Sequence, residues 1–213
     1  MGFVASDSGG GGDFKRVPPG VFIARCFGLI DLGTQRVEFQ GDIKLQHKML
    51  VKWELFGEDD DGHPLEVEFE GKTMPMTISK RYTVSLNEKA RLRQDLASWR
   101  GKDFSDEEAK GFDVSKLIGA YCMLNISQSE TNGKIYSNVA AITPLPGALK
   151  NAKPAPIHAN QVFDLDKPDM ALMASFHEKL QETIKASMEW AQIGKQSSKP
   201  NYAAAGFGPD AAD

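Results

Sequence analysis

The feature that most constrains the fold is a change of hydrophobic period along the chain. Residues 48–56 alternate between apolar and mostly charged side chains, which is the period-two pattern of a strand with one buried face. Leu92, Leu96 and Trp99 instead fall on one stripe of an amphipathic helix. The sequence therefore predicts strands with a helix inserted among them.

Strand patterns surround that helix on both sides. Asn87 is a candidate N-cap, Gly101 sits where a left-handed C-cap belongs, and residues 105–108 form a capping-box pattern that opens a short second helix ending at Gly111. Asn132-Gly133 strongly favours a hairpin between the last two strands. The expected strands are 21–32, closed by Gly33, then 48–56 with an extension over 67–69, then 76–86, 120–127 and 134–143.

Three strands, a helix and two strands follow one another in the order of an OB-fold. We therefore predict a mainly β protein: a five-stranded OB-fold barrel with a helix between strands 3 and 4, plus a C-terminal α-helix and flexible tails. The expected parts are a glycine-rich arm (1–17), the OB-fold domain (18–146), a proline-containing linker (147–167), a helix that begins with Pro168 at its first position (168–193) and a disordered tail (194–213). The apolar stripe of the C-terminal helix predicts docking either on its own barrel or on a second subunit.

The composition is that of a globular protein. The 213 residues are 41% hydrophobic and 25% charged, and no apolar run approaches the roughly 20 residues that cross a bilayer. The first residues lack the cationic and apolar parts of a signal peptide, which predicts a soluble, cytoplasmic protein without a membrane partner. Cys26 and Cys122 each lie in an apolar stretch, as expected of reduced core thiols.

Charge is distributed unevenly around a net value of -4. Residues 54–70 carry eight acids and no Lys or Arg, whereas residues 15–52 and 76–102 sum to +4 and +5. A fold that joins the two basic segments would present a basic face. A solvated surface of mixed sign is the alternative.

Patterns for catalysis and metal binding are weak, which predicts no enzyme, no cofactor and no metal site. The four histidines are scattered, without the spacing of a zinc site, and no nucleophile elbow occurs. Asp59, Asp61 and Glu68 fall at ligand positions of a calcium loop, but Gly57 occupies the first position and the flanks read as strands. A solvated acidic turn is the preferred interpretation.

Six short blocks of the sequence carry a resemblance to a known family. The blocks are 17–20 (VPPG), 33–35 (GTQ), 85–93 (SLNEKARLR), 98–104 (SWRGKDF), 117–125 (LIGAYCMLN) and 142–146 (ITPLP). They resemble blocks of a tailed-phage family of OB-fold single-stranded DNA-binding proteins. The resemblance covers roughly residues 15–193 and implies the OB-fold and a role in phage replication or recombination, in the host-cell cytoplasm.

Single-stranded DNA requires a basic groove interleaved with flat aromatic faces. On an OB-fold these lie on strands 2 and 3 and on the loops between strands 1 and 2 and between strands 4 and 5. A core position is the alternative for Tyr82, whereas Phe39 is expected in a glycine-bounded loop. The candidate DNA-binding residues are Arg36, Phe39, Lys44, Lys48, Lys52, Lys80, Arg81, Tyr82, Lys134 and Tyr136.

The predicted function is sequence-tolerant binding that protects single-stranded DNA, with recruitment of replication or recombination proteins by the C-terminal tail and a homodimer as further expectations. The alternative is an OB-type protein-interaction module that binds a replication or recombination enzyme.

Overall fold

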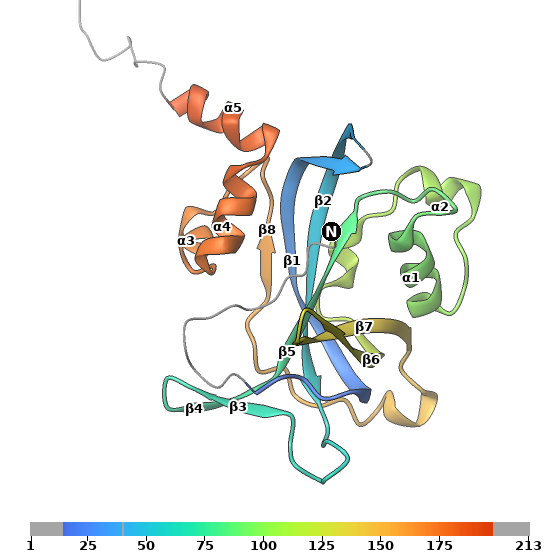
Figure 1. Cartoon of the computed structure of the whole chain (residues 1–213). Helices are drawn as coiled ribbons and strands as arrows, with labels where there is room; N and C mark the ends of the chain where they lie inside the picture. Colours follow the sequence, from blue (N-terminus) through green and yellow to red (C-terminus); the bar gives the residue numbers. More distant parts are fainter. Residues whose placement is uncertain (1–14, 40, 198–213) are drawn as a thin grey trace, which may run out of the picture.

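The protein is built on one large antiparallel sheet, which confirms the mainly β prediction (Figure 1). The computed structural model describes residues 15–39 and 41–197, so the tail after residue 197 and most of the predicted N-terminal arm lie outside the described residues. The strand order is β5-β2-β1-β6-β7. These strands are β1 (Gly20–Phe39), β2 (Asp42–Phe56), β5 (Thr77–Thr83), β6 (Tyr121–Thr131) and β7 (Lys134–Pro144).

The two edge strands of this order, β5 and β7, approach each other without a backbone ladder between them in the described residues. A side chain bridges them instead, because Lys80 Nζ donates to the carbonyl oxygen of Val139 at 3.0 Å. The sheet is therefore not closed by strand pairing, and a five-stranded barrel is not confirmed.

The first hairpin is longer than predicted. β1 continues past Gly33 to Phe39, and β2 begins at Asp42, so the expected long loop is a two-stranded ribbon. The register shifts between Asp31 and Gly33, and Gly33 has a φ of 66°. Gly33 thus marks a bulge that bends the strand rather than a residue that ends it.

A separate hairpin lies between β2 and β5. β3 (Glu66–Phe69) and β4 (Lys72–Pro75) pair only with each other, so residues 67–69 do not extend a strand of the main sheet. Glu58 and Pro64 form an isolated bridge near its base. The acidic segment of the sequence is this hairpin and the turn that leads to it.

The helix after β5 has the expected buried stripe and C-cap but a later start. α1 (Arg91–Arg100) has Ala90 at its N-cap, so the prediction of Asn87 is wrong; the Asn87 side chain accepts from the Lys89 backbone N–H instead. Gly101 ends α1 in the left-handed conformation, with a φ of 71°. α2 (Asp106–Lys110) has the predicted capping box, a 3-10 turn η1 (Val114–Leu117) follows, and a two-residue turn with positive φ at both positions joins β6 to β7.

The predicted linker and single C-terminal helix are replaced by several short elements. The linker segment contains a 3-10 turn η2 (Gly147–Leu149) and β8 (Gln161–Phe163), which pairs in parallel with residues 28–30 of β1. Three helices follow: α3 (Met170–Ala174), α4 (Glu178–Lys185) and α5 (Met188–Ser197). Asp169 is the side-chain N-cap of α3, so this helix begins at Met170 and not at the predicted Pro168. His177 is the side-chain N-cap of α4, so a new helix begins where one continuous helix was expected.

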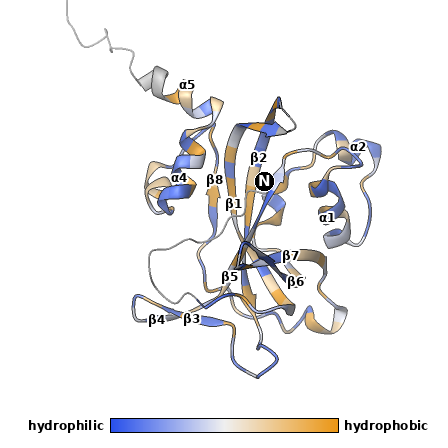
Figure 2. Ribbon diagram, in the orientation of Figure 1, coloured by the Kyte–Doolittle hydropathy of each residue, from blue (hydrophilic) through white to orange (hydrophobic). Residues whose placement is uncertain are grey.

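Two apolar clusters lie on opposite faces of the sheet. Figure 2 shows apolar and polar residues mixed along most strands. The larger cluster packs α1 against the sheet and includes both cysteines, which are free thiols. The smaller one packs the C-terminal elements against β1 and β2 through Ile30, Leu32, Leu50, Phe163, Leu165, Met173, Phe176 and Ile184. The C-terminal segment therefore docks on its own sheet.

Candidate functional site

Three lysines follow one face of β2. Met49, Val51 and Trp53 point into the larger cluster, so the alternate residues Lys44, Lys48 and Lys52 share the opposite face. Arg81 on β5 pairs with Leu50 and is therefore a diagonal neighbour of both Lys48 and Lys52. We call Lys44, Lys48, Lys52 and Arg81 the basic face.

The lysines of the basic face that lie nearest the core bond to neutral groups. Lys48 Nζ donates to Gln46 Oε1 at 2.5 Å and to Thr83 Oγ1 at 2.7 Å. Lys52 Nζ donates to Gln161 Oε1 at 2.9 Å. Burial lowers the pKa of both amines, and the neighbouring Arg81 charge lowers the pKa of Lys48 further.

Arg81 is the least compensated member of the basic face. Among the described residues its buried Nε has no hydrogen-bond partner, and burial lowers the pKa of its guanidinium. Within residues 15–39 and 41–197, no ion pair joins Lys44, Lys48, Lys52 or Arg81 to a carboxylate. A cluster of cations that has no carboxylate partner in the described residues, and in which Lys48, Lys52 and Arg81 are half-buried, favours an anionic ligand, which would restore the solvation that burial removes.

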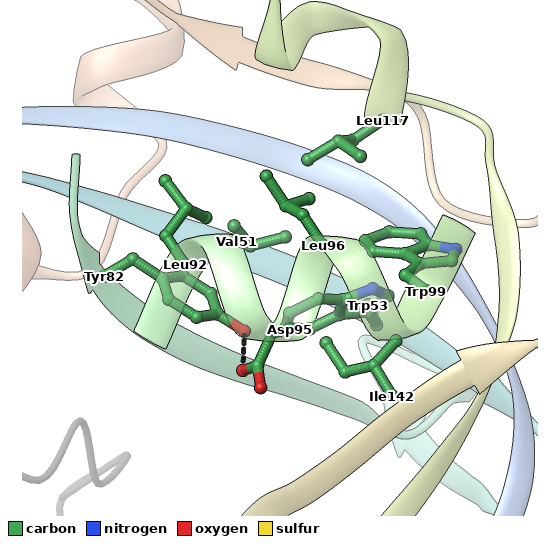
Figure 3. Close-up of a pocket in the computed structure, with 9 residues that line it drawn as sticks. All are labelled: Val51, Trp53, Tyr82, Leu92, Asp95, Leu96, Trp99, Leu117 and Ile142. Carbon is green, nitrogen blue, oxygen red and sulfur yellow. Dashed lines mark hydrogen bonds between the residues drawn. The ribbon is translucent and has the colours of Figure 1, made fainter. Parts of the chain in front are cut away.

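Lys80 and Tyr82 do not belong to this face, because they point to the other side of β5. Lys80 Nζ lies 2.6 Å from Asp95 Oδ2, Tyr82 Oη donates to the same oxygen at 2.8 Å, and Arg91 Nε lies 2.9 Å from Asp95 Oδ1. Figure 3 shows the Tyr82 ring turned toward Asp95 among the apolar residues of α1 and β2. With 4% of Tyr82 exposed, its ring has no free face for a base in this structure. Lys80 and Tyr82 therefore do not join the basic face, and a contact of either residue with DNA stays a prediction.

The sequence held a signal for this buried network. Asp95 lies three residues after Leu92 and one before Leu96, which places a carboxylate on the stripe that faces the core. Burial and the Asp95 carboxylate raise the pKa of Tyr82, whereas burial lowers the pKa of Lys80 against the opposing effect of Asp95. A buried acid therefore required cationic and hydroxyl partners from the neighbouring strand.

A small cavity lies beside this network (Figure 3). Its volume is about 10 Å³, and it is lined by Val51, Trp53, Tyr82, Leu92, Asp95, Leu96, Trp99, Leu117 and Ile142. Such a volume holds about one water molecule. The cavity is a packing defect of the core, with no room for a nucleotide or a cofactor.

The ribbon formed by β1 and β2 separates the remaining candidates of the first hairpin. Arg36 pairs with Leu45, and Lys44 pairs with Val37, so Arg36 projects from the face opposite Lys44. Phe39 ends β1 and pairs with Asp42; the prediction that it lies in a loop is wrong, and its side chain lies outside the described part of the molecule.

Lys134 and Tyr136 lie on another strand pair. They follow the turn between β6 and β7, where Lys134 is exposed and Tyr136 is half-buried. Both occupy the face of β7 opposite the buried Val139. In strand order β1 and β6 lie between β7 and β2. On the other side β7 approaches β5 at Val139, which lies five residues after Lys134 and three after Tyr136, so we do not include these two residues in the basic face.

A polar clamp that the sequence did not predict fixes the chain over the end of the basic face. Arg25 Nε donates to Glu54 Oε1, its NH1 donates to Asn160 Oδ1 at 2.8 Å, and Glu54 Oε2 accepts from the His158 backbone N–H at 2.8 Å. Burial opposes ionisation of Glu54, but the His158 N–H and Arg25 together hold its pKa below the usual value. The one signal was an arginine within the apolar run 21–32.

The predicted acidic turn contains one further cluster. Ligand atoms of Asp59, Asp61 and His63 lie within 4.8 Å of one another. Asp59 Oδ1 already accepts from the backbone N–H groups of Asp61 and His63. The elements on both sides are strands, so the helices of the calcium-binding motif are absent from this described segment.

Comparison of the chain with protein-family models found no matching family, and a search of curated proteins found no match. Among the helices of the described residues, none has the length and apolar character needed to span a membrane.

Proposed function

We propose that the protein is an OB-type, sequence-tolerant single-stranded DNA-binding protein that protects exposed strands in phage replication or recombination in the host-cell cytoplasm. Three features of the chain support the OB-type assignment. The strand order places β2 between β1 and β5, a helix separates β5 from β6, and β5 approaches β7.

The observation that carries the proposal is the uncompensated basic face. Four cations line β2 and β5, at the position where OB-folds bind oligonucleotides. Arg81 has a buried Nε that donates to no group of the described chain. Phosphates would supply the missing negative charge, and released counterions would make the binding depend on salt.

Neither Phe27 nor Tyr136 offers the basic face an exposed aromatic ring on which a base could stack. Phe27 lies beside Lys52, with its ring 5.0 Å from Lys52 Nζ, but the ring is 1% exposed and stacks on His158. Tyr136 is on β7, away from the basic face. In this proposal the backbone phosphates therefore dominate the affinity and the bases contribute little.

A protein-interaction role is the second candidate, and one observation favours it. The face of the ribbon opposite the basic face exposes Ile43 (59%) and Leu45 (56%). Val84 (43%), which follows β5 and bonds to the His47 carbonyl of β2, is a third exposed aliphatic side chain. Grouped apolar side chains of this kind are typical of protein contacts. This candidate predicts no dependence on the basic face.

Fluorescence titration of labelled oligothymidine at several salt concentrations distinguishes the two. Four phosphate contacts predict a slope of log affinity against log salt of about -3, at about -0.7 per contact. Lys48→Glu with Arg81→Glu should lower the affinity by at least about tenfold. Lys116→Glu, an exposed lysine of η1, is the matched control and should change it little. A slope near zero, or equal losses in the variant and the control, contradicts the proposal.

A further inference from the structure

The hairpin formed by β3 and β4 is a sheet fragment without a partner. The two strands pair only with each other, so each has an outer edge without a strand in the described chain. Glu66 and Glu68 share one face of β3, and Val67 and Phe69 share the other. Phe69 is 60% exposed, although Val67 packs against the larger core. The base of the hairpin is thus anchored and its end is free to contact another molecule.

The exposed face of this hairpin is negatively charged. Glu70 continues the row of Glu66 and Glu68 into the turn, where it adopts a φ of 50°. We call these three residues the acidic face. No ion pair in the described residues involves any of them, and the only hydrogen bond to their side chains comes from Thr73 Oγ1 to Glu68 Oε1. Alternate like charges repel one another along a strand, and an opposite charge would relieve that repulsion.

Within one molecule the acidic face lies away from the Lys48 end of the basic face. The hairpin leaves the sheet at Phe56, beyond the Lys52 end of the basic face, and Figure 1 shows it directed away from the ribbon end of β2. Lys48 lies eight residues before Phe56, which corresponds to about 27 Å of extended strand. Backbone hydrogen bonds from Leu65 N to Gly57 O (3.0 Å) and from Met76 N to Leu65 O (2.7 Å) fix the base.

The spacing of the two charged faces is complementary. Glu66 and Glu68 are two residues apart on one face of a strand, or about 7 Å. Lys48 and Arg81 are diagonal neighbours on paired strands, which places them about 7–8 Å apart. Two carboxylates of one molecule can therefore meet two cations of another at the same time, and one of these cations, Arg81, has a buried Nε without a partner in the described residues.

We infer that the acidic face of one copy docks on the basic face of a second copy. The contact joins two different surfaces, so the association is head to tail, and an open chain of copies keeps one unused acidic face and one unused basic face at its ends. The inference goes beyond DNA binding, but one consequence rests on the proposed function: single-stranded DNA competes for the basic face and separates the copies. Self-association would then keep the basic face of the DNA-free protein covered.

Ionic strength governs such a contact. The Debye length shortens from about 30 Å at 0.01 M salt to about 8 Å at 0.15 M, so association is expected at low salt and is weakened near physiological salt. Sedimentation of the full chain at low and high salt measures this directly. We expect an average mass above the 23.3 kDa monomer at low salt and a return toward the monomer at high salt.

A charge swap identifies the two surfaces. Variant A carries Glu66→Lys and Glu68→Lys, and variant B carries Lys48→Glu and Arg81→Glu. Each alone opposes like charges and should associate at least about tenfold more weakly than the wild type. An equimolar mixture should associate again, because the hairpin of A, now positively charged, meets the face of B that is now negatively charged. The control, Glu178→Lys with Glu182→Lys on the exposed side of α4, should associate as the wild type does.

The outcomes separate this inference from the proposed function. Variant A should bind oligothymidine at least as tightly as the wild type, whereas variant B tests DNA binding itself. A wild type that stays monomeric at low salt, an A and B mixture that stays monomeric, or an equal loss in the α4 control overturns the second-copy contact, whatever the DNA affinity. Binding of an oligolysine peptide to the acidic face without self-association would also overturn it, in favour of a different basic partner.

Discussion

The network around Asp95 gives the sharpest test of how the sheet is held at its open edge. Asp95 is 6% exposed and accepts from Lys80 and Tyr82, with Arg91 as a second cation. Asp95→Ala would leave the Lys80 ammonium, with 18% of its side chain exposed, facing only the Val139 carbonyl. Removing one partner of a buried ion pair costs about 3–5 kcal/mol. At about 2–4 °C per kcal/mol for a domain of this size, the melting temperature should fall by about 10 °C.

Urea unfolding followed by tryptophan fluorescence measures that loss, with Glu107→Ala as the control. Glu107 has 87% of its side chain exposed and lies 3.3 Å from Lys110 on α2. An exposed pair of this kind contributes about 0.5 kcal/mol or less. Oligothymidine affinity, measured where both variants are folded, should be unchanged. Equal stability losses in the two variants would refute the reasoning, and so would a loss of DNA affinity with intact stability, since it would return Lys80 to the binding face.

Four further outcomes follow from single side chains. Ile184→Ala, at 0% exposure in the smaller core, should cost about 2–5 kcal/mol and make the C-terminal helices sensitive to limited proteolysis. Gly33→Ala should lower the melting temperature, because φ is 66° and the new Cβ would lie 2.6 Å from Ser187 Cβ; unchanged melting would contradict the bulge. The folded-state pKa of Glu54 is lowered, so its contribution to stability is present above the usual value of 4.5 and is lost as the pH falls through the lowered pKa; Glu54→Gln should remove this acid dependence of the unfolding free energy. Burial raises the pKa of the Cys26 thiol to about 12, so a disulfide reagent at pH 8 should react with it only after urea unfolding.

Local patterns predicted the elements whose structure depends on neighbouring residues. The stripe of α1, the left-handed Gly101, the capping box of α2 and the Asn132-Gly133 turn each need only a few adjacent side chains. Gly33 was misread because a glycine that ends a strand and a glycine that forms a bulge look alike in sequence. Only the register of β2 across from β1 distinguishes them.

Long-range packing decided the rest. The apolar stripe near Met173 and Ile184 is compatible with one long helix or with several short ones. In the structure these residues pack in the smaller cluster, and side-chain caps begin separate short helices. On the candidate face the alternation of β2 correctly grouped Lys48 with Lys52. The bond between Lys80 and Asp95 was not predicted, because Asp95 lies 15 residues away, on a helix that packs against the same strand.

The pairing of β8 with β1 has a consequence for how the chain is made. Ile30 and Phe163 are partners across that pair, yet 133 residues separate them in the sequence. At about 5–20 residues per second, a ribosome needs on the order of 10 s to synthesise that interval. Throughout this time the outer face of β1 is already made while the segment that covers it is not. The nascent protein therefore presents an apolar strip that a ribosome-associated chaperone could shield, and slow codons between β1 and β8 would prolong that exposure.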